Sequence, residues 1–90
     1  MTADEASIRA LAALARLGMG ASSIQQQQRA ATRIALHVGR LQYGDAYVLG
    51  RLAQAEDLLL QLADTASLDA GAEVLGEIAT IADSVLARSF

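Results

Sequence analysis

Residues 67–87 have the sequence SLDAGAEVLGEIATIADSVLA, and this stretch decides the fold class. When its residues are placed at about 100° intervals, as in an α-helix, the apolar and acidic side chains separate onto opposite sides. The apolar side contains Gly71, Val74, Ile78, Ile81, Ala82 and Val85, and the polar side contains Asp69, Glu73, Glu77 and Asp83. Ser67 precedes the pattern and suits an N-cap, because its hydroxyl can accept a hydrogen bond from a free backbone N–H group. The stretch therefore predicts an amphipathic helix over residues 68–87 that packs against other helices.

The same reading predicts three further helices before this one, over residues 4–17, 23–43 and 46–63. Polar residues suited to N-caps stand at the start of each (Thr2 or Asp4, Ser22 or Ser23, and Asp45). Short connections between helices are typical of antiparallel neighbours in a bundle. The predicted fold class is all-α, a small bundle of about four amphipathic helices with short loops, in a single domain over residues 1–90.

Glycines mark the expected ends of these helices. Gly18 is expected to end the first helix at Leu17, because Gly suits the left-handed conformation that closes many helices. Gly44 is expected to separate the second and third helices. An alternative stays open, because no Pro lies near Gly44. The two helices could run on as one long bent helix, which would favour an intertwined dimer.

The composition agrees with a helical domain and makes several classes of protein improbable. The chain has 90 residues, of which 53% are hydrophobic, and most of these are Ala and Leu, which are strong helix formers. It has no Pro and no Cys, so neither a disulfide framework nor thiol chemistry is expected. No window reaches the roughly 18–20 uninterrupted apolar residues of a membrane span, and no secretory signal pattern is present. We therefore expect a cytoplasmic location.

The predicted third helix has more apolar surface than one neighbouring helix can bury. Its apolar residues cover well over half of the circumference, and Glu56 lies within that arc. In so small a domain, surplus apolar surface is expected to be buried in an interface. The predicted apolar partner-binding residues are Val48, Leu49, Leu52, Leu59, Leu60 and Leu62.

Charge is distributed unevenly along the chain. Residues 1–44 carry two acidic residues and five arginines, a balance of +3, whereas residues 45–90 carry eight acidic residues and two arginines, a balance of −6. Such an asymmetry indicates contacts with partners. The predicted charged partner-binding residues are a stripe on the second helix (Arg29, Arg33, His37 and Arg40) and a stripe on the fourth (Asp69, Glu73 and Glu77). Either stripe could instead be a solvated surface, or the acidic stripe could meet the basic stripe of a neighbouring copy.

Two tyrosines near the second connection and four glycines inside the predicted helices need a separate explanation. Tyr43 and Tyr47 are expected to close one end of the core, or to offer an aromatic anchor to a partner. Four glycines lie inside predicted helices, where each costs about 1 kcal/mol relative to Ala. Close approach between helices is the expected compensation at these four positions, which are Gly39, Gly50, Gly71 and Gly76.

Catalytic and cofactor sites are not expected. His37 is the only histidine, so no site with paired imidazole ligands can form, and no Glu-x-x-His pair of a carboxylate-bridged metal site is present. The serines suit caps or surface positions, and Gly18-Met19-Gly20 lacks the pattern of a phosphate-binding loop. No metal, cofactor or small-molecule substrate is therefore predicted.

Two alternatives use the charged stripe of the second helix. In histidine-phosphotransfer domains, a solvent-facing His on a four-helix bundle is followed at +3 and +4 by Lys and Gly. His37 is followed by Arg40 and Leu41 at these positions, so Arg40 could stabilise a phosphate, but Leu41 is bulky where a small residue is expected. The arginines could also contact nucleic acid phosphates, although no aromatic residue is interleaved for base stacking.

We therefore expect a non-enzymatic helical interaction protein. It would act as a homo-oligomer, as an adaptor, regulator or secretion-type chaperone that binds an amphipathic helix of a partner protein, or as both. Phosphotransfer through His37 is the alternative, and nucleic acid binding is a weaker third hypothesis.

Overall fold

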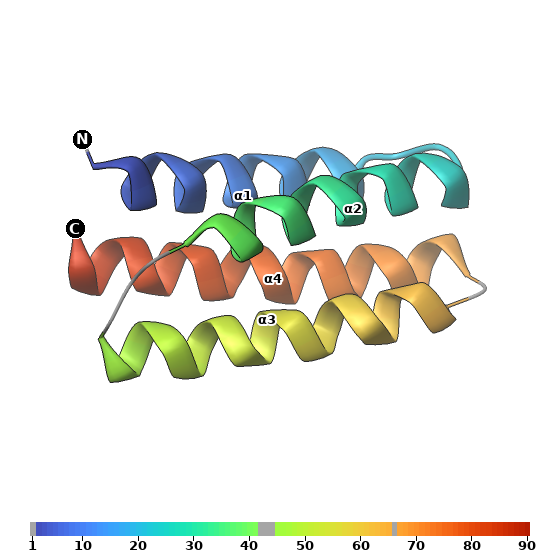
Figure 1. Cartoon of the computed structure of the whole chain (residues 1–90). Helices are drawn as coiled ribbons and strands as arrows, with labels where there is room; N and C mark the ends of the chain where they lie inside the picture. The colour runs from blue at the N-terminus through green and yellow to red at the C-terminus, as the bar shows by residue number, and fades with distance from the viewer. Residues whose placement is uncertain (1, 42–44, 66) are drawn as a thin grey trace.

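The computed structural model describes residues 2–41, 45–65 and 67–90, and these form four helices. The helices are α1 (Ala3–Met19), α2 (Ile24–Arg40), α3 (Ala46–Asp64) and α4 (Leu68–Ser89). Successive helices run in opposite directions (Figure 1). In that view α1 and α2 lie above α3 and α4. The predicted class, a small all-α bundle with short loops, is confirmed.

Side-chain caps begin all four helices, for the reason expected from the sequence. The first N–H groups of a helix have no partner within it, and a short polar side chain before the helix can accept from them. The capping oxygens and the N–H groups that donate to them are Thr2 and Glu5 (3.0 Å), Ser23 and Gln26 (3.2 Å), Asp45 and Tyr47 (2.8 Å), and Ser67 and Ala70 (3.3 Å). Local sequence therefore determines where each helix starts.

The end of α1 differs from the expectation. The helix continues through Gly18 to Met19, and no described residue has a positive φ, so neither Gly18 nor Gly20 takes the left-handed conformation. Gly18 is instead buried against α2 and α4, where an added Cβ would lie 2.6 Å from Leu75 Cδ1 and 3.1 Å from Ala30 Cβ. Gly18 therefore allows close packing between helices and does not terminate α1.

The second and third helices are separate. Leu41 caps the C-terminal end of α2 in an extended conformation, with φ −72° and ψ 136°, and Asp45 is extended before α3. A single continuous helix, one of the two alternatives, is therefore excluded. α2 ends at Arg40, earlier than expected, and the predicted end at Tyr43 and the predicted break at Gly44 lie outside the described residues.

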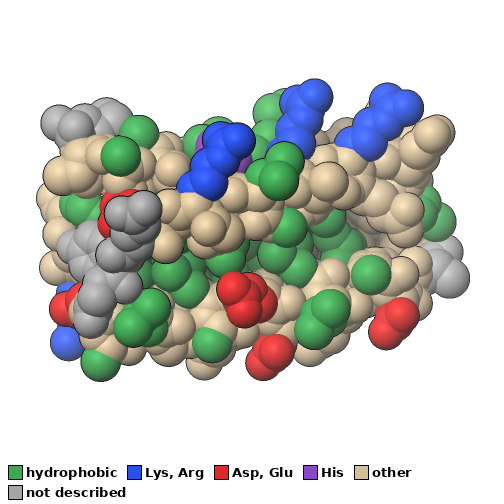
Figure 2. All heavy atoms as spheres, in the orientation of Figure 1, with side chains coloured by type: hydrophobic (Ala, Val, Ile, Leu, Met, Phe, Trp, Pro, Cys, Tyr) green, Lys and Arg blue, Asp and Glu red, His purple; other side chains and the backbone are tan. Residues whose placement is uncertain are grey.

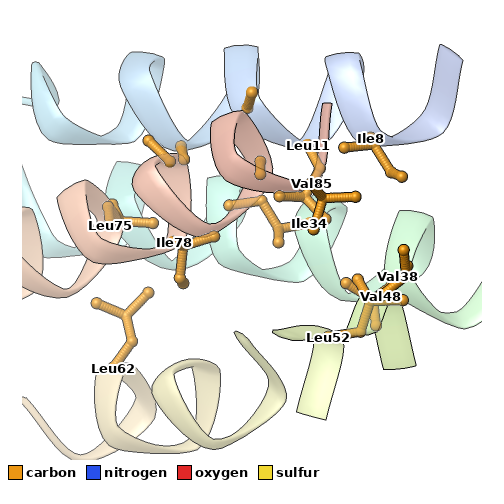
Figure 3. Close-up of a cluster of buried hydrophobic side chains, with 14 residues drawn as sticks. Ile8, Leu11, Ile34, Val38, Val48, Leu52, Leu62, Leu75, Ile78 and Val85 are labelled. Carbon is orange, nitrogen blue, oxygen red and sulfur yellow. The ribbon is translucent and has the colours of Figure 1, made fainter. Parts of the chain in front are cut away.

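The core contains apolar side chains from every helix (Figure 3). α1 packs along both α2 and α4, and α3 packs along α4, whereas α2 and α3 approach each other much less closely. The largest fully buried apolar residues are Ile8, Leu11, Ile34, Val48, Leu62, Leu75, Ile78 and Val85. The looser contact between α2 and α3 leaves part of the apolar surface of both helices uncovered.

One buried polar residue joins the starts of α2 and α4. Gln27 is 1% exposed, and its Nε2 donates a hydrogen bond of 2.6 Å to the carbonyl oxygen of Leu68. The absence of a side chain at Gly71 makes room for it, since an added Cβ would lie 2.8 Å from Gln27 Cδ. Of the glycines inside helices, Gly71 thus shows the expected compensation through close approach.

None of the helices in the described ranges is both long enough and apolar enough to cross a lipid bilayer.

Candidate protein-binding surfaces

The apolar arc predicted on the third helix is divided between core and surface. Val48, Leu52 and Leu62 are 0%, 9% and 1% exposed, and Figure 3 shows them among the core side chains. Val48 and Leu52 are therefore unavailable to a partner, and Leu62 offers no more than the floor of a hollow between α2 and α3, which corrects the assignment of these three residues to an exposed binding surface. The physical reason is that α3 is covered by both α4 and α2, so its wide apolar arc has two neighbours to contact rather than one.

The other three residues of that arc remain accessible. Leu60 is 70% exposed and Leu49 is 51% exposed, and Leu59 is half-buried against the core. Leu59 and Leu60 lie on the side of α3 that faces α2. The surplus predicted from the sequence is therefore real but smaller than expected, and part of it is directed at the gap between two helices.

That gap is an apolar groove, which we call the α2–α3 groove. It consists of two hollows that share Ala35 and Leu59. In Figure 2, hydrophobic side chains lie between the upper half of the molecule, which carries most of the visible basic side chains, and the lower half, which carries most of the acidic ones. The lining residues are Gln28, Ala31, Thr32, Ala35, Val38 and Gly39 from α2 and Glu56, Leu59, Leu60, Leu62 and Ala63 from α3.

Small side chains open this groove on the α2 side. Ala31, Ala35 and Gly39 recur at four-residue intervals, which places them on one side of the helix. A Cβ added to Gly39 would meet nothing within 4 Å, and the same is true of Gly50. The close approach expected at these two glycines is therefore absent within the bundle.

The basic stripe lies on the outer side of α2, away from the groove. Arg29, Arg33 and Arg40 are exposed, and His37 is half-buried. Together with Leu17 and Leu36 they border shallow hollows between α1 and α2. The Nδ1 atom of His37 is buried and has no hydrogen-bond partner among the described residues, so this nitrogen is not open to a phosphoryl donor.

An exposed leucine within the basic stripe was missed from the sequence. Leu36 is 57% exposed and lies between Arg33 and Arg40 along α2. The signal was present, because helical periodicity places position 36 within about 60° of the three arginine positions. Leu17, on α1 beside it, is 71% exposed. We call the surface formed by Leu17, Arg29, Arg33, Leu36 and Arg40 the basic face.

The acidic stripe borders a different hollow, which we call the α3–α4 groove. Asp69, Glu73 and Glu77 are all exposed on α4. Glu73 and Glu77 stand at the rim of an open groove of about 740 Å³, and Asp57 of α3, which sequence analysis did not single out, joins them. The groove is lined by Arg51, Gln54, Asp57, Leu58, Gln61, Glu73, Gly76, Glu77, Thr80 and Ile81.

The other arginines are engaged within the chain. Arg9 pairs with Glu5 at 3.0 Å, and Arg16 of α1 pairs with Asp83 of α4. Arg51 donates to Gln54 Oε1 at 2.7 Å and to Ser84 Oγ at 3.1 Å. These contacts join residues of one helix or link two neighbouring helices of the bundle.

Arg88 of α4 contacts the aromatic ring of Tyr47 on α3. The Arg88 guanidinium carbon lies 4.1 Å from the centre of the Tyr47 ring, a distance typical of a cation–π interaction. Tyr47 is half-buried against the core, which agrees with its predicted position at one end of the core. Tyr43, the other tyrosine of that prediction, lies outside the described residues.

Several serine side chains have structural contacts. Ser84 donates to the carbonyl oxygen of Ile81 at 2.8 Å and accepts from Arg51, and Ser23 and Ser67 are caps. Across the described ranges, no three side chains of His, Cys, Asp or Glu come together in a way that could hold a metal ion. The candidate binding surfaces among the described residues are the two grooves and the basic face.

Comparison with known proteins adds no relative to this picture: no family model, curated protein or solved structure matches the chain.

Proposed function

We propose that this chain is a non-enzymatic helical interaction protein that holds an amphipathic helix of a partner protein in the α2–α3 groove. The observation that carries the proposal is an apolar, solvent-open groove between two helices, with Leu60 70% exposed at its edge. An adaptor, a regulator or a secretion-type chaperone would use such a groove in the same way, by covering the apolar side of a partner helix.

The shape of the groove supports a helical occupant. Ala31, Ala35 and Gly39 line α2 with small side chains, which allows the backbone of another helix to approach closely. Leu59 and Leu60 line the opposite wall. Apolar side chains at positions i, i+4 and i+7 of a partner helix would lie along this groove, as in other helix-in-groove complexes.

One carboxylate among the described lining residues supports a basic partner helix. Glu56 is exposed and lines the same hollow as Leu60, and its carboxylate has no ion-pair partner in the described part of the chain. A Lys or Arg beside the apolar side of the partner helix would pair with it. Such a charge contributes more to orientation and specificity than to affinity.

The experiment uses the intact chain as bait in the extract of its native source, with two leucine variants of the same helix. Leu60→Asp places a charge in the α2–α3 groove, whereas Leu49→Asp makes the same change at an exposed position of α3 outside it. Both positions are more than half exposed, so both variants should fold. A partner that is retained by the wild type and by Leu49→Asp, but lost from Leu60→Asp, supports the proposal. Capture of the same proteins by all three baits would contradict it.

A second pair of variants separates loss of binding from loss of stability. Gly39→Leu fills the groove, and Gly50→Leu adds the same side chain to α3 at a position where an added Cβ also meets nothing. Because Leu has the higher helix propensity, both should stabilise the bundle by up to about 1 kcal/mol. Only Gly39→Leu should lose the partner, and equal binding by the two variants would show that the groove is not the site.

A further inference from the structure

The charges that remain unpaired among the described residues separate by sign onto different helices. Four arginines have the contacts described above (Arg9, Arg16, Arg51 and Arg88). The guanidinium groups of the other three, Arg29, Arg33 and Arg40, have no ion pair or hydrogen bond with any residue that the structure describes, and all three lie on α2. The carboxylates without such a contact lie on α3 and α4, and they are Glu56, Asp57, Asp64, Asp69, Glu73 and Glu77.

The basic face carries the three arginines and the α3–α4 groove carries three of the carboxylates, Asp57, Glu73 and Glu77. Both surfaces also offer apolar area. Leu36 projects from the basic face between Arg33 and Arg40 and is 57% exposed, and Leu17 of α1 is 71% exposed. The α3–α4 groove has Leu58 and Ile81 in its lining, below the carboxylates of its rim. The basic face, with a projecting leucine beside arginines, is thus complementary in shape and charge to the α3–α4 groove, with an apolar hollow beside carboxylates.

We propose that copies of this chain associate with one another through these two surfaces. Leu36 of one copy enters the α3–α4 groove of the next, and Arg29 and Arg33 contact the rim carboxylates of Glu73 and Glu77. The spacing agrees: Arg29 and Arg33 are four residues apart on α2, as are Glu73 and Glu77 on α4, which corresponds to about 6 Å along each helix. Two adjacent arginines can therefore meet two adjacent glutamates.

The position of the two surfaces determines the kind of assembly. α1 and α2 form one side of the bundle and α3 and α4 form the other (Figure 1). Because the basic face and the α3–α4 groove lie on opposite sides, the contact joins unlike surfaces and leaves one of each free at the ends. Such a heterologous contact extends into a ring or a linear chain and does not close as a two-fold dimer.

A second copy fits the basic face better than a nucleic acid does. The whole chain has a net charge of −3, which repels a polyanion, whereas the α3–α4 groove provides carboxylates together with an apolar lining for Leu36. This self-association uses surfaces other than the α2–α3 groove, so it does not depend on the proposed binding of a partner helix.

Light scattering coupled to size-exclusion chromatography tests the proposal on the purified full chain. At low salt, the wild type should show a mass well above the 9.4 kDa of one chain, increasing with protein concentration. The mass should fall towards that of the monomer at high salt, because salt screens exposed charges. A wild type that stays monomeric at low salt and high protein concentration overturns the proposal. This holds equally if the monomer binds duplex DNA through its arginines.

Charge-reversal variants identify the surfaces. Arg33→Glu places a negative charge in the basic face, and Glu77→Arg places a positive charge at the rim of the α3–α4 groove. Each change replaces an attraction between copies by a repulsion, so each variant alone should be monomeric. Mixed in equal amounts, they should associate, because Glu77→Arg retains an intact basic face and Arg33→Glu retains an intact α3–α4 groove. Failure of the mixture to associate, when the wild type does, overturns the proposed pairing of surfaces.

Matched controls keep the net charge of each variant. Arg9→Glu has the same charge change as Arg33→Glu but lies on α1 outside the basic face, and Glu56→Arg has the same change as Glu77→Arg but lies in the α2–α3 groove. Both controls should associate as the wild type does, and a monomeric control would show that net charge alone governs the association. Glu56→Arg should in turn lose a partner helix, which separates a failure of this inference from a failure of the proposed function.

Discussion

Replacing Gly71 by Ala is expected to destabilise the bundle, whereas the same replacement at Gly50 is expected to stabilise it. Both glycines lie inside helices, where Ala is favoured over Gly by about 1 kcal/mol. At Gly50 nothing lies within 4 Å of an added Cβ, so most of this gain should be observed. At Gly71 the new Cβ would lie 2.8 Å from Gln27 Cδ, and the Gln27 side chain has to move.

The cost of that movement follows from the surroundings of Gln27. The side chain is 1% exposed, and its Nε2 donates to the Leu68 carbonyl oxygen at 2.6 Å. Breaking this hydrogen bond and leaving the buried amide without a partner costs about 1–3 kcal/mol. Set against the gain of about 1 kcal/mol in helix propensity, this cost gives an expected net loss of up to about 2 kcal/mol for Gly71→Ala.

Urea denaturation of the single variants and a double-mutant cycle with Gln27→Ala measure both effects. In the Gln27→Ala background the obstruction is gone, so Gly71→Ala should become neutral or stabilising. A loss of 1 kcal/mol should also lower the melting temperature by about 4–8 °C in a domain of this size. The reasoning is refuted if Gly71→Ala stabilises the protein as Gly50→Ala does, or if its cost is the same with and without the Gln27 side chain.

Three further predictions concern stability. Leu75→Ala should lower the free energy of unfolding by about 2–5 kcal/mol, because it leaves a cavity in the core. Leu60→Ala, at a residue 70% exposed, should change it by less than about 0.5 kcal/mol. Similar denaturation midpoints for the two variants would contradict the burial of these residues. Asp45→Ala should cost about 1 kcal/mol by removing the cap of α3, and Asp45→Asn should retain most of it at neutral pH, since an amide oxygen can also accept; an equal loss in both would indicate a role for the charge. The pair between Arg16 and Asp83, with both side chains about half exposed, should give a coupling below about 1 kcal/mol in a double-mutant cycle, and a coupling that persists at high salt would disagree with this.

Much of the secondary structure could be predicted because its causes are local. Thr2, Ser23, Asp45 and Ser67 were candidate caps and are the caps observed, since a cap requires only one short polar side chain next to a few free N–H groups. Ile78, Ile81, Ala82 and Val85 were placed on the inner side of the fourth helix and are buried. The same periodicity did not reveal the role of Gln27, because a buried glutamine in a run of four has the sequence appearance of a solvated one.

The candidate binding surfaces were only partly predictable, because the periodicity of one helix does not show which of its apolar residues the neighbouring helices cover. Val48 and Leu60 belong to one apolar arc in the sequence, yet the first is fully buried and the second is 70% exposed. The difference depends on where α2 and α4 stand relative to α3. Likewise, the stripe on α2 could be read from the arginines, but only the contacts of Arg9, Arg16, Arg51 and Arg88 with other residues show that Arg29, Arg33 and Arg40 are the ones left unpaired.

The sequence by itself determined that this protein consists of four amphipathic helices, where each helix begins, and which charges each carries. Helix periodicity and capping depend on residues within a few positions of one another, so they are written in local stretches such as residues 67–87. The tertiary structure alone decided that Gly18 packs inside the bundle, that Gln27 is buried beside Gly71, and that α2 and α3 leave a groove between them. These features depend on distances between helices, which are set by the fit of side chains far apart in the chain.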